Sequence, residues 1–347
     1  MVKHGKQGVD MVTMRDVAKV AGVSLGVVSR IVNQDPTLRV TEKTKKHVEK
    51  VVKELGYIPS KHAGHQVAVI MAFNEKRIIT DPYFSELLNQ IHYFCQKSTL
   101  RVSMTLWAAN KLDLNCLQDY HGVIIIGPFT TSFITSIKKI VNCVVVIDDN
   151  TNIDQINQIK SDFNLVTIKI LNDFKAVGRK RITFVGGDIE KINSSGKSWN
   201  NLVDVRLETY SQWMHKHALS PDIVNVGLTV EDGRKAGEYL INRRRNDEYN
   251  FPNAIIALND LIARGIIDIF SENNIKVPND VCIVGFDNLP ITELKHPTIT
   301  SVKIPIGDVA NAAIRLLRDQ INQTLTGVNI VTVPSKIISR ESFKKIN

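Results

Sequence analysis

The 347-residue chain lacks the features that mark membrane, secreted and metal-binding proteins. No segment approaches the roughly 18 consecutive apolar residues that cross a bilayer, and residues 1–16 have no apolar centre of a signal peptide. The four cysteines stand far apart, without a C-x-x-C pair or a histidine at metal-ligand spacing. We therefore predict a cytoplasmic protein with reduced core thiols, no disulfide framework and no metal site.

The sequence also lacks the motifs that position catalytic groups. It contains no G-x-S-x-G nucleophile elbow and no H-E-x-x-H helix. Residues 196–198 (GKS) resemble the end of a phosphate-binding loop, but Lys191 stands where that motif requires glycine, so we interpret the segment as a loop. These absences predict a protein that is not an enzyme and that needs no cofactor.

Positive charge is present and is concentrated at the N-terminus. Residues 1–61 hold 12 Lys and Arg against 6 Asp and Glu, which accounts for +6 of the net charge of +9. A basic segment of this size attracts a polyanion and releases its counterions, which is the electrostatic basis of nucleic-acid binding. The alternative is a lysine-rich helix face that is merely solvated.

Periodicity predicts three short helices in this basic segment, at about 13–21, 25–33 and 41–55. A capping residue precedes each apolar stripe: Thr13, Ser24 and Thr41. Glycine and valine at 22–23 form a tight turn between the first two helices, and two short helices joined in this way are a helix-turn-helix unit. Residues 12–59 are therefore predicted to be a small all-α head.

The head resembles that of the lactose/galactose repressor family of bacterial transcription regulators. The resemblance is carried by residues 14–33 (MRDVAKVAGVSLGVVSRIVN) and 54–59 (ELGYIP), and it continues through almost the whole chain. It implies that the second helix lies in the major groove of operator DNA. There Arg30 is predicted to recognise a base, because a guanidinium can bond guanine O6 and N7 together. Most of the other residues are predicted to contact phosphates and so to position the head along the duplex. The predicted DNA-binding residues are Met14, Ser24, Leu25, Gly26, Ser29, Arg30, Asn33, Thr44 and Tyr57. The alternative is a three-helix interaction module that never contacts DNA.

The hinge after the head departs from the family. Members commonly follow this point with a short helix whose leucine enters the minor groove and kinks the duplex. Here residues 60–66 are short and contain no leucine, and Gly64 weakens a helix. We therefore expect no minor-groove wedge, and at most phosphate contacts from Lys61, His62 and His65.

From Val67 onward, apolar runs alternate with helical patterns, which predicts α/β structure with parallel sheets covered by helices. The eight predicted strands are 67–73, 101–107, 122–127, 143–148, 181–186, 223–227, 253–258 and 281–286. Eight such runs suit two doubly wound lobes.

The resemblance implies the bilobed fold of periplasmic sugar-binding proteins for residues 67–347. We predict a first lobe at about 67–161 plus 295–325 and a second at about 162–290 plus 326–342. Ligands of open α/β sheets lie beyond the carboxyl ends of the strands, so the cleft between the lobes is the predicted ligand site.

Several polar residues follow strands at this edge. The family's motifs match at 204–206 (D-x-R), 258–260 (L-N-D), 285–287 (G-F-D) and 81–84, where D-P-Y-F stands for the family's N-P-F-F turn. Carboxylates, an amide and a guanidinium together suit sugar hydroxyls, which both donate and accept hydrogen bonds. The predicted effector-binding residues are Tyr83, Phe84, Asp148, Arg206, Asn259 and Asp287.

Two of these residues have purely structural alternatives. Asn259 stands where a helix cap is needed, and the role of Asp287 could be limited to closing a turn before Pro290. Leu228 occupies a position where many relatives carry an aromatic ring, which disfavours a purine ligand.

We therefore expect a homodimeric repressor of sugar-utilisation genes. It would bind double-stranded operator DNA under the allosteric control of a small sugar or sugar phosphate, with a galactoside favoured. Two alternatives remain: a sugar-binding protein or enzyme with a vestigial head, and a regulator whose co-effector is a partner protein.

Overall fold

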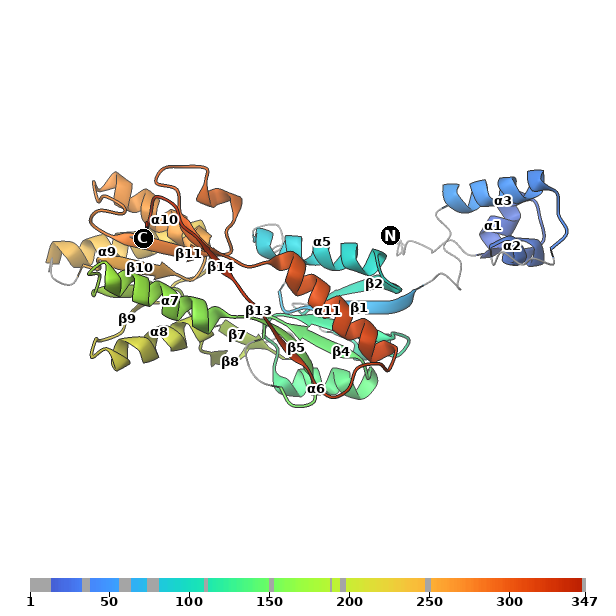
Figure 1. Ribbon diagram of the computed structural model, residues 1–347, viewed down its shortest axis with the longest axis horizontal. Helices are drawn as coiled ribbons and strands as arrows, with labels where there is room; N and C mark the ends of the chain where they lie inside the picture. The colour runs from blue at the N-terminus through green and yellow to red at the C-terminus, as the bar shows by residue number, and fades with distance from the viewer. Residues whose placement is uncertain are drawn as a thin grey trace, which may run out of the picture.

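The computed structural model describes residues 14–32, 38–55, 64–73, 81–108, 112–149, 153–187, 189–193, 198–246 and 251–344. These ranges form a helical head and two α/β lobes, the lobes lying side by side along the long axis of the molecule (Figure 1). The predicted fold class is confirmed.

The head contains three helices: α1 (Met14–Ala21), α2 (Leu25–Val32) and α3 (Glu42–Glu54). The turn between α1 and α2 places Gly22 at a φ of 64°, a conformation that glycine adopts without steric cost. Ser24 and Thr41 cap the next two helices, as predicted, by accepting hydrogen bonds from the backbone N–H groups three residues ahead. A small apolar core closes the head: Val17, Ala21, Val28, Ile31, Val48 and Val51 are buried.

The first lobe is built on a six-stranded parallel sheet in the order β13-β5-β4-β3-β1-β2. Its elements are β1 (His65–Met71), α5 (Pro82–Gln96), β2 (Leu100–Trp107), η1 (Leu114–Leu117), β3 (Gly122–Ile126), α6 (Thr131–Ile140), β4 (Val144–Ile147), β5 (Asn157–Ser161), α11 (Ile306–Ile321) and β13 (Ile330–Val333). Alternate residues of β1 face opposite sides: Val67 and Val69 pack with α5 and α11, whereas Ala68 and Ile70 pack with α6. Helices therefore cover both faces.

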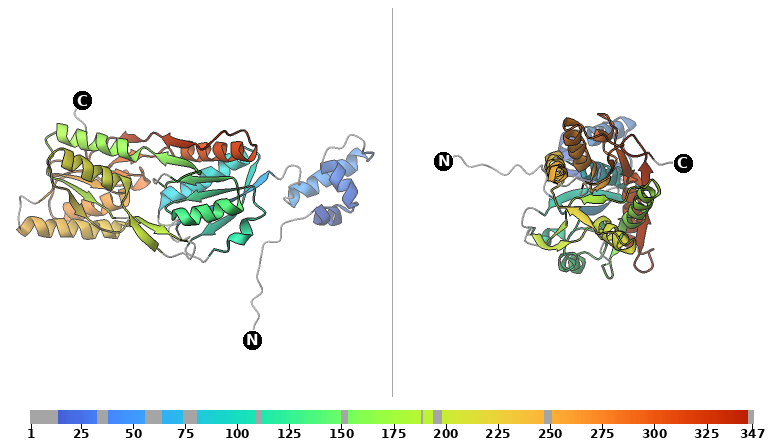
Figure 2. Two further views of the ribbon diagram at one scale, coloured as in Figure 1. Left: turned by 90° about the horizontal axis from the view of Figure 1, so that it is seen from below. Right: turned by 90° about the vertical axis from the view of Figure 1, so that its left-hand side faces the viewer.

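The second lobe repeats this plan with the sheet order β14-β12-β11-β10-β6-β9, in which β14 is antiparallel to its neighbour. Its elements are α7 (Phe163–Ala176), β6 (Ile182–Val185), β7 (Ile189–Ile192), β8 (Ser198–Leu202), α8 (Val205–Lys216), β9 (Asp222–Val224), α9 (Val230–Asn246), β10 (Ala254–Ala257), α10 (Asp260–Glu272), β11 (Cys282–Phe286), η3 (Pro290–Thr292), β12 (Thr300–Lys303) and β14 (Lys336–Ile338). Helices α7 and α8 cover one face of the sheet, and α9 and α10 the other (Figures 1 and 2).

The chain crosses between the lobes three times, and two crossings differ from those predicted. The first falls between β5 and α7. Strand β12 pairs with β11 in the second lobe, so the next crossing lies after Lys303 rather than before residue 295. Strand β13 pairs with β5 in the first lobe, so the last crossing lies after Val333 rather than near residue 325. The predicted placements of 295–303 and 326–333 are wrong because these short, partly polar strands gain their stability from sheet neighbours that lie far away in the sequence.

Three smaller expectations also need correction. Strand β1 begins at His65, two residues earlier than predicted, and the His65 ring contacts that of His121, so His65 belongs to the body. The other two residues predicted to contact phosphates, Lys61 and His62, lie outside the described residues. Of residues 196–198, interpreted as a loop, Ser198 begins β8, which pairs antiparallel with β7, and residues 196 and 197 lie outside the described residues. All four cysteines are free, but Cys116 is exposed and is not a core thiol. In the described part of the chain no helix is long and apolar enough to cross a membrane.

Candidate functional site

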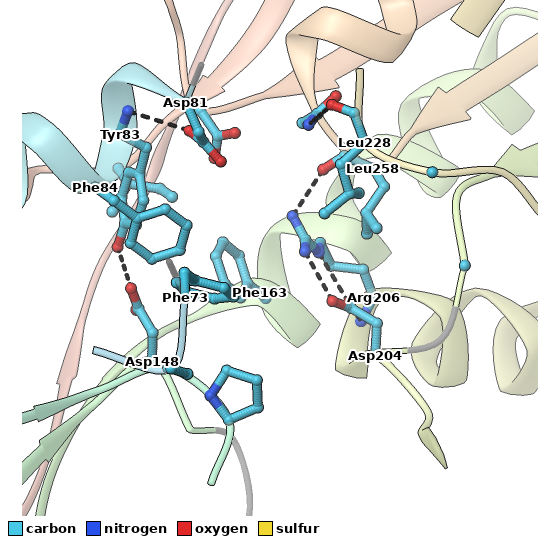
Figure 3. A pocket seen from close by; sticks show the side chains of 18 of the residues that line it. Phe73, Asp81, Tyr83, Phe84, Asp148, Phe163, Asp204, Arg206, Leu228 and Leu258 are labelled. Carbon is cyan, nitrogen blue, oxygen red and sulfur yellow. Dashed lines mark hydrogen bonds and ion pairs between the residues drawn. The ribbon is translucent and has the colours of Figure 1, made fainter. Parts of the chain in front are cut away.

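A cavity of about 320 Å³ lies between the two lobes, at the carboxyl ends of the parallel strands. Residues from both sheets line it, as Figure 3 shows. All six residues predicted from the sequence are brought together here: Tyr83, Phe84, Asp148, Arg206, Asn259 and Asp287. Their role in binding a ligand stays a prediction.

Asp148 is the first polar group on the wall of the first lobe. It follows β4 in a left-handed conformation, with a φ of 59°, and it accepts a hydrogen bond from the phenol of Tyr83 in the first turn of α5 (Figure 3). Burial raises the pKa of Asp148 to about 6, against the opposing effects of the Tyr83 hydrogen bond and the Arg206 charge. Burial and then the Asp148 charge raise the pKa of Tyr83 well above its usual value, so the phenol remains a donor.

Aromatic rings form an apolar wall beside this pair. Phe84 lies on α5 next to Tyr83, with ring centroids 5.0 Å apart, and Phe73 at the end of β1 packs on it at 4.4 Å. Phe163 at the start of α7 completes this side (Figure 3). An apolar wall facing a few fixed polar groups is typical of a small-molecule site.

Among the described residues that line the cavity, the one cationic side chain is that of Arg206, and hydrogen bonds fix its guanidinium. Asp204 caps α8, accepts from the Arg206 backbone N–H, and binds the guanidinium through both oxygens, at 2.8 Å to Nε and 2.7 Å to Nη2. Nη1 donates to the carbonyl of Leu258 at 2.8 Å. Three of the five guanidinium N–H groups make these bonds, which leaves two for a ligand. The rings of Phe163 and Phe286 flank the guanidinium at 4.7 and 5.0 Å.

Asp287 projects from a turn that the second lobe holds at three successive backbone positions. Asp287 N–H donates to the carbonyl of Val302, Asn288 N–H to Ser301 Oγ, and Leu289 N–H to Asp260 Oδ2. Asp287 and Asn288 have φ values of 92° and 53°, so these bonds stabilise an unusual backbone conformation. The turn that was the alternative interpretation of Asp287 is therefore present, and the Asp287 side chain also lines the cavity.

The electrostatic environment of Asp287 is unfavourable for a charged carboxylate. Burial raises its pKa to about 7, the Arg206 charge opposes this, and nearby carboxylates, including Asp81 and Asp148, add to it. Two carboxyl groups with raised pKa values thus face one cavity.

Asn259 has the structural role that was its alternative interpretation. Its Oδ1 accepts from Ile262 N–H at 2.9 Å and caps α10, while its Nδ2 donates to the carbonyl of Leu228 at 3.0 Å. These bonds fix the amide at the cavity wall, with one N–H remaining for a ligand. Leu228 also lines the cavity, where its aliphatic side chain gives no ring face.

The head presents a second candidate surface on α2. Val28 and Ile31 face the core, whereas Leu25, Gly26 and Arg30 are exposed. Of the other predicted DNA-binding residues in the described part of the chain, Ser24 is exposed and three are half-buried: Met14, Ser29 and Thr44. Asn33 and Tyr57 lie outside the described residues.

Comparison with known proteins supports the same two-part division. Residues 13–60 match the model for bacterial regulatory proteins of the lacI family, and residues 171–343 match a periplasmic binding protein-like domain. The chain thus carries a lacI-family regulatory domain and a periplasmic binding protein-like domain. The HTH-type transcriptional regulator GalR of Lacticaseibacillus casei is 27% identical over 340 residues, which cover 96% of this chain and 99% of that protein. The regulator GanR of Bacillus subtilis (strain 168) is 24% identical, over 96% and 100% of the two chains.

Solved structures show the same fold as this chain. A lac repressor dimer bound to operator and the anti-inducer ONPF superposes with a TM-score of 0.72 at 20% identity, over 95% of this chain and 98% of that one. A complex of the transcriptional regulator CelR with cellobiose gives a TM-score of 0.67 at 20% identity, over 96% and 100%.

Several residues that line the cavity were not among the predicted effector-binding residues. Asp204 was noted only as part of the D-x-R motif, yet it fixes the Arg206 guanidinium. A cap residue two positions before an arginine is a local signal that could have identified it. Phe163 and Ile192 could not have been found in this way, because the lobe crossing and the β7–β8 pairing bring them to the cavity.

The raised pKa of Asp287 predicts a pH-dependent stability for this protein. The unfolded carboxyl has a pKa near 3.8 and the folded one about 7, so the folded state binds more protons between these values and stability falls as pH rises through this window. The substitution Asp287→Asn, which tolerates the positive φ, is expected to raise the Tm of the ligand-free body on the order of 5 °C at pH 8 and to change it little at pH 5.

Scanning calorimetry of the full chain from pH 5 to pH 8 measures this difference. Asp113→Asn is the matched control, because Asp113 is an exposed cap that accepts from Asn115 N–H and asparagine caps equally well. Equal Tm changes at pH 5 and pH 8 in Asp287→Asn would contradict the assignment.

Proposed function

We propose that this chain is a cytoplasmic transcription regulator, a repressor of sugar-utilisation genes, whose affinity for operator DNA is controlled by a small sugar bound between its lobes. The observation that carries the proposal is the convergence of Asp148, Arg206, Asn259 and Asp287 from both lobes on one cavity that also has an aromatic wall.

The chemistry of the cavity suits a polyhydroxyl ligand. Each sugar hydroxyl donates one hydrogen bond and accepts others, and the cavity supplies both partners. Asp148 and Asp287 accept, whereas Arg206 offers two N–H groups at fixed positions. The Arg206 charge is already paired with Asp204, so a neutral sugar is favoured over a sugar phosphate.

The names of similar proteins support a sugar of the galactoside class. GalR and GanR are named as HTH-type transcriptional regulators, MelR of Bacillus subtilis (strain 168) as a repressor, and one structural neighbour of this fold is a complex with lactose. No enzymatic role is proposed, since these relatives are regulators.

Control of DNA binding follows from the position of the cavity. A ligand that contacts both lobes favours the lobe arrangement in which all its contacts form, and it can shift operator affinity only by its preference for that arrangement. The lac repressor in the similar structure is a dimer on its operator. We propose a homodimer here also, with one head for each half of a palindromic site.

The test is binding of the purified full chain to its own upstream DNA. Fluorescence anisotropy at several salt concentrations, with and without galactose, lactose, melibiose and cellobiose, gives both affinity and salt slope. We expect specific binding that falls steeply with salt and changes with one sugar by about tenfold or more. A scrambled duplex of equal length is the control. Weak binding that is the same for both duplexes would favour a sugar-binding protein with a vestigial head.

A further inference from the structure

The β7–β8 hairpin leaves the second lobe directly after β6 and reaches the first lobe. Ile192 N–H donates to the carbonyl of Pro128 at 2.9 Å, and Thr130 N–H donates to the carbonyl of Ile192 at 3.0 Å. These bonds form a parallel bridge between Phe129 and Ile192. The hairpin therefore joins the lobes through backbone hydrogen bonds, in addition to the three crossings of the chain.

An ion pair reinforces this contact. Lys191 on β7 lies 3.6 Å from Asp149 Oδ2 in the first lobe, and the Asp149 side chain is fully buried while that of Lys191 is 13% exposed. Lys160 on β5 also interacts electrostatically with both groups. A buried carboxylate that loses its cationic partner is costly, so the pair opposes separation of the hairpin from the first lobe.

The hairpin lies on the side of the molecule away from the crossings (Figure 2). Ile192 lines the cavity and also packs against the apolar core of the first lobe around Phe129 and Phe133. Ile304, beside the second crossing, lines the cavity as well. The cavity is thus bounded by covalent connections on one side and by a non-covalent contact on the other.

We infer that the β7–β8 hairpin is a clasp across the cleft and that Ile192 on it determines the size of the sugars that the cavity admits. The clasp follows from the contacts alone, whereas the role of Ile192 in selection rests on the proposed sugar-sensing function. Ligand entry requires the lobes to separate on the side where no chain crosses. The clasp must then open, and its wall residue limits what fits once it has closed.

The clasp is tested without any ligand, by hydrogen exchange of the full chain. Lys191→Glu places a second carboxylate against Asp149, and we expect the Thr130 and Ile192 amides to exchange about tenfold faster or more, while Ile125 in the sheet core is unchanged. Lys336→Glu, the same change at an exposed lysine of β14, is the control. Unchanged exchange at Thr130 in Lys191→Glu overturns the clasp.

Selection by Ile192 is tested by calorimetric titration with galactose, lactose and raffinose. Ile192→Ala keeps both backbone bonds and removes the wall, so we expect it to bind the longer sugars about tenfold more tightly than wild type. Ile140→Ala makes the same truncation at another half-buried isoleucine that packs against the same apolar core but does not line the cavity, and it should give no such gain. An unchanged order of affinities in Ile192→Ala overturns the selection role. If no sugar binds the wild type or either variant, the proposed sensing function fails, and the exchange experiment still decides the clasp.

Discussion

The substitution Arg206→Lys is expected to weaken sugar binding by a hundredfold or more and to leave ligand-free operator binding within about twofold. Lysine keeps the charge but loses the planar fork that lets the guanidinium bond Asp204 through two nitrogens, reach the Leu258 carbonyl and still present two N–H groups to the cavity. Each lost hydrogen bond from a charged donor costs about 1.5–3 kcal/mol, and two such losses give the expected factor.

The choice of lysine rather than alanine protects the fold. The exposed fraction of Asp204 is 2%, and removing its cation would leave a buried charge unpaired, at a cost of about 3–5 kcal/mol. The double variant Arg206→Met with Asp204→Asn removes both charges and gives a second test in which no unpaired charge is buried.

Isothermal titration with the sugar that alters operator binding measures the loss. Arg264→Lys is the matched control, because Arg264 is also a buried arginine paired with an aspartate, Asp268, at 3.0 Å, but it does not line the cavity. Comparable loss of sugar affinity in Arg264→Lys would show that general destabilisation, rather than a lost ligand contact, is the cause. Sugar binding by Arg206→Lys at wild-type strength would remove Arg206 from the site.

Local signals in the sequence account for what was predicted well. The helices of the head begin after Ser24 and Thr41 because these caps satisfy N–H groups within three residues, and their apolar stripes recur at helical spacing. The eight predicted strands all form, and the inner ones, such as β3, β4 and β10, are continuous apolar runs of the kind that suits a strand covered by helices on both faces.

The errors arise where distant segments supply the stability. Strand β12 (TSVK) is held in the second lobe by its pairing with β11, and β13 (IVTV) is held in the first lobe by its pairing with β5. No local pattern reveals such pairing, so the second and third lobe crossings were placed too early. The hairpin was missed for the same reason, because contacts of Ile192 with the first lobe help to hold it.

The site shows a mixed outcome. Polar residues after apolar strands were found because a parallel sheet brings these ends to one edge. The sequence could not distinguish a capping from a ligand-binding role for Asn259, since the same amide both caps α10 through Ile262 N–H and lies on the wall of the cavity.

Arg30→Ala is expected to abolish specific operator binding and to leave sugar binding unchanged. Arg30 is exposed on α2, one residue before Ile31, which anchors the helix in the core of the head, so the truncation does not disturb packing. A bidentate contact to guanine is worth about 1–3 kcal/mol, and a dimer loses it in both half-sites, so affinity should fall on the order of a hundredfold or more.

The measurement separates base reading from charge. Lys53→Ala removes the same single positive charge from an exposed position on α3 and should weaken operator binding no more than about threefold. Binding of Arg30→Ala to a scrambled duplex should also stay near the wild-type value, since phosphate contacts dominate there. If Arg30→Ala and Lys53→Ala weaken operator binding equally, the head binds by charge alone and Arg30 does not read a base. If Arg30→Ala binds operator like wild type, Arg30 makes no contact that matters for operator binding.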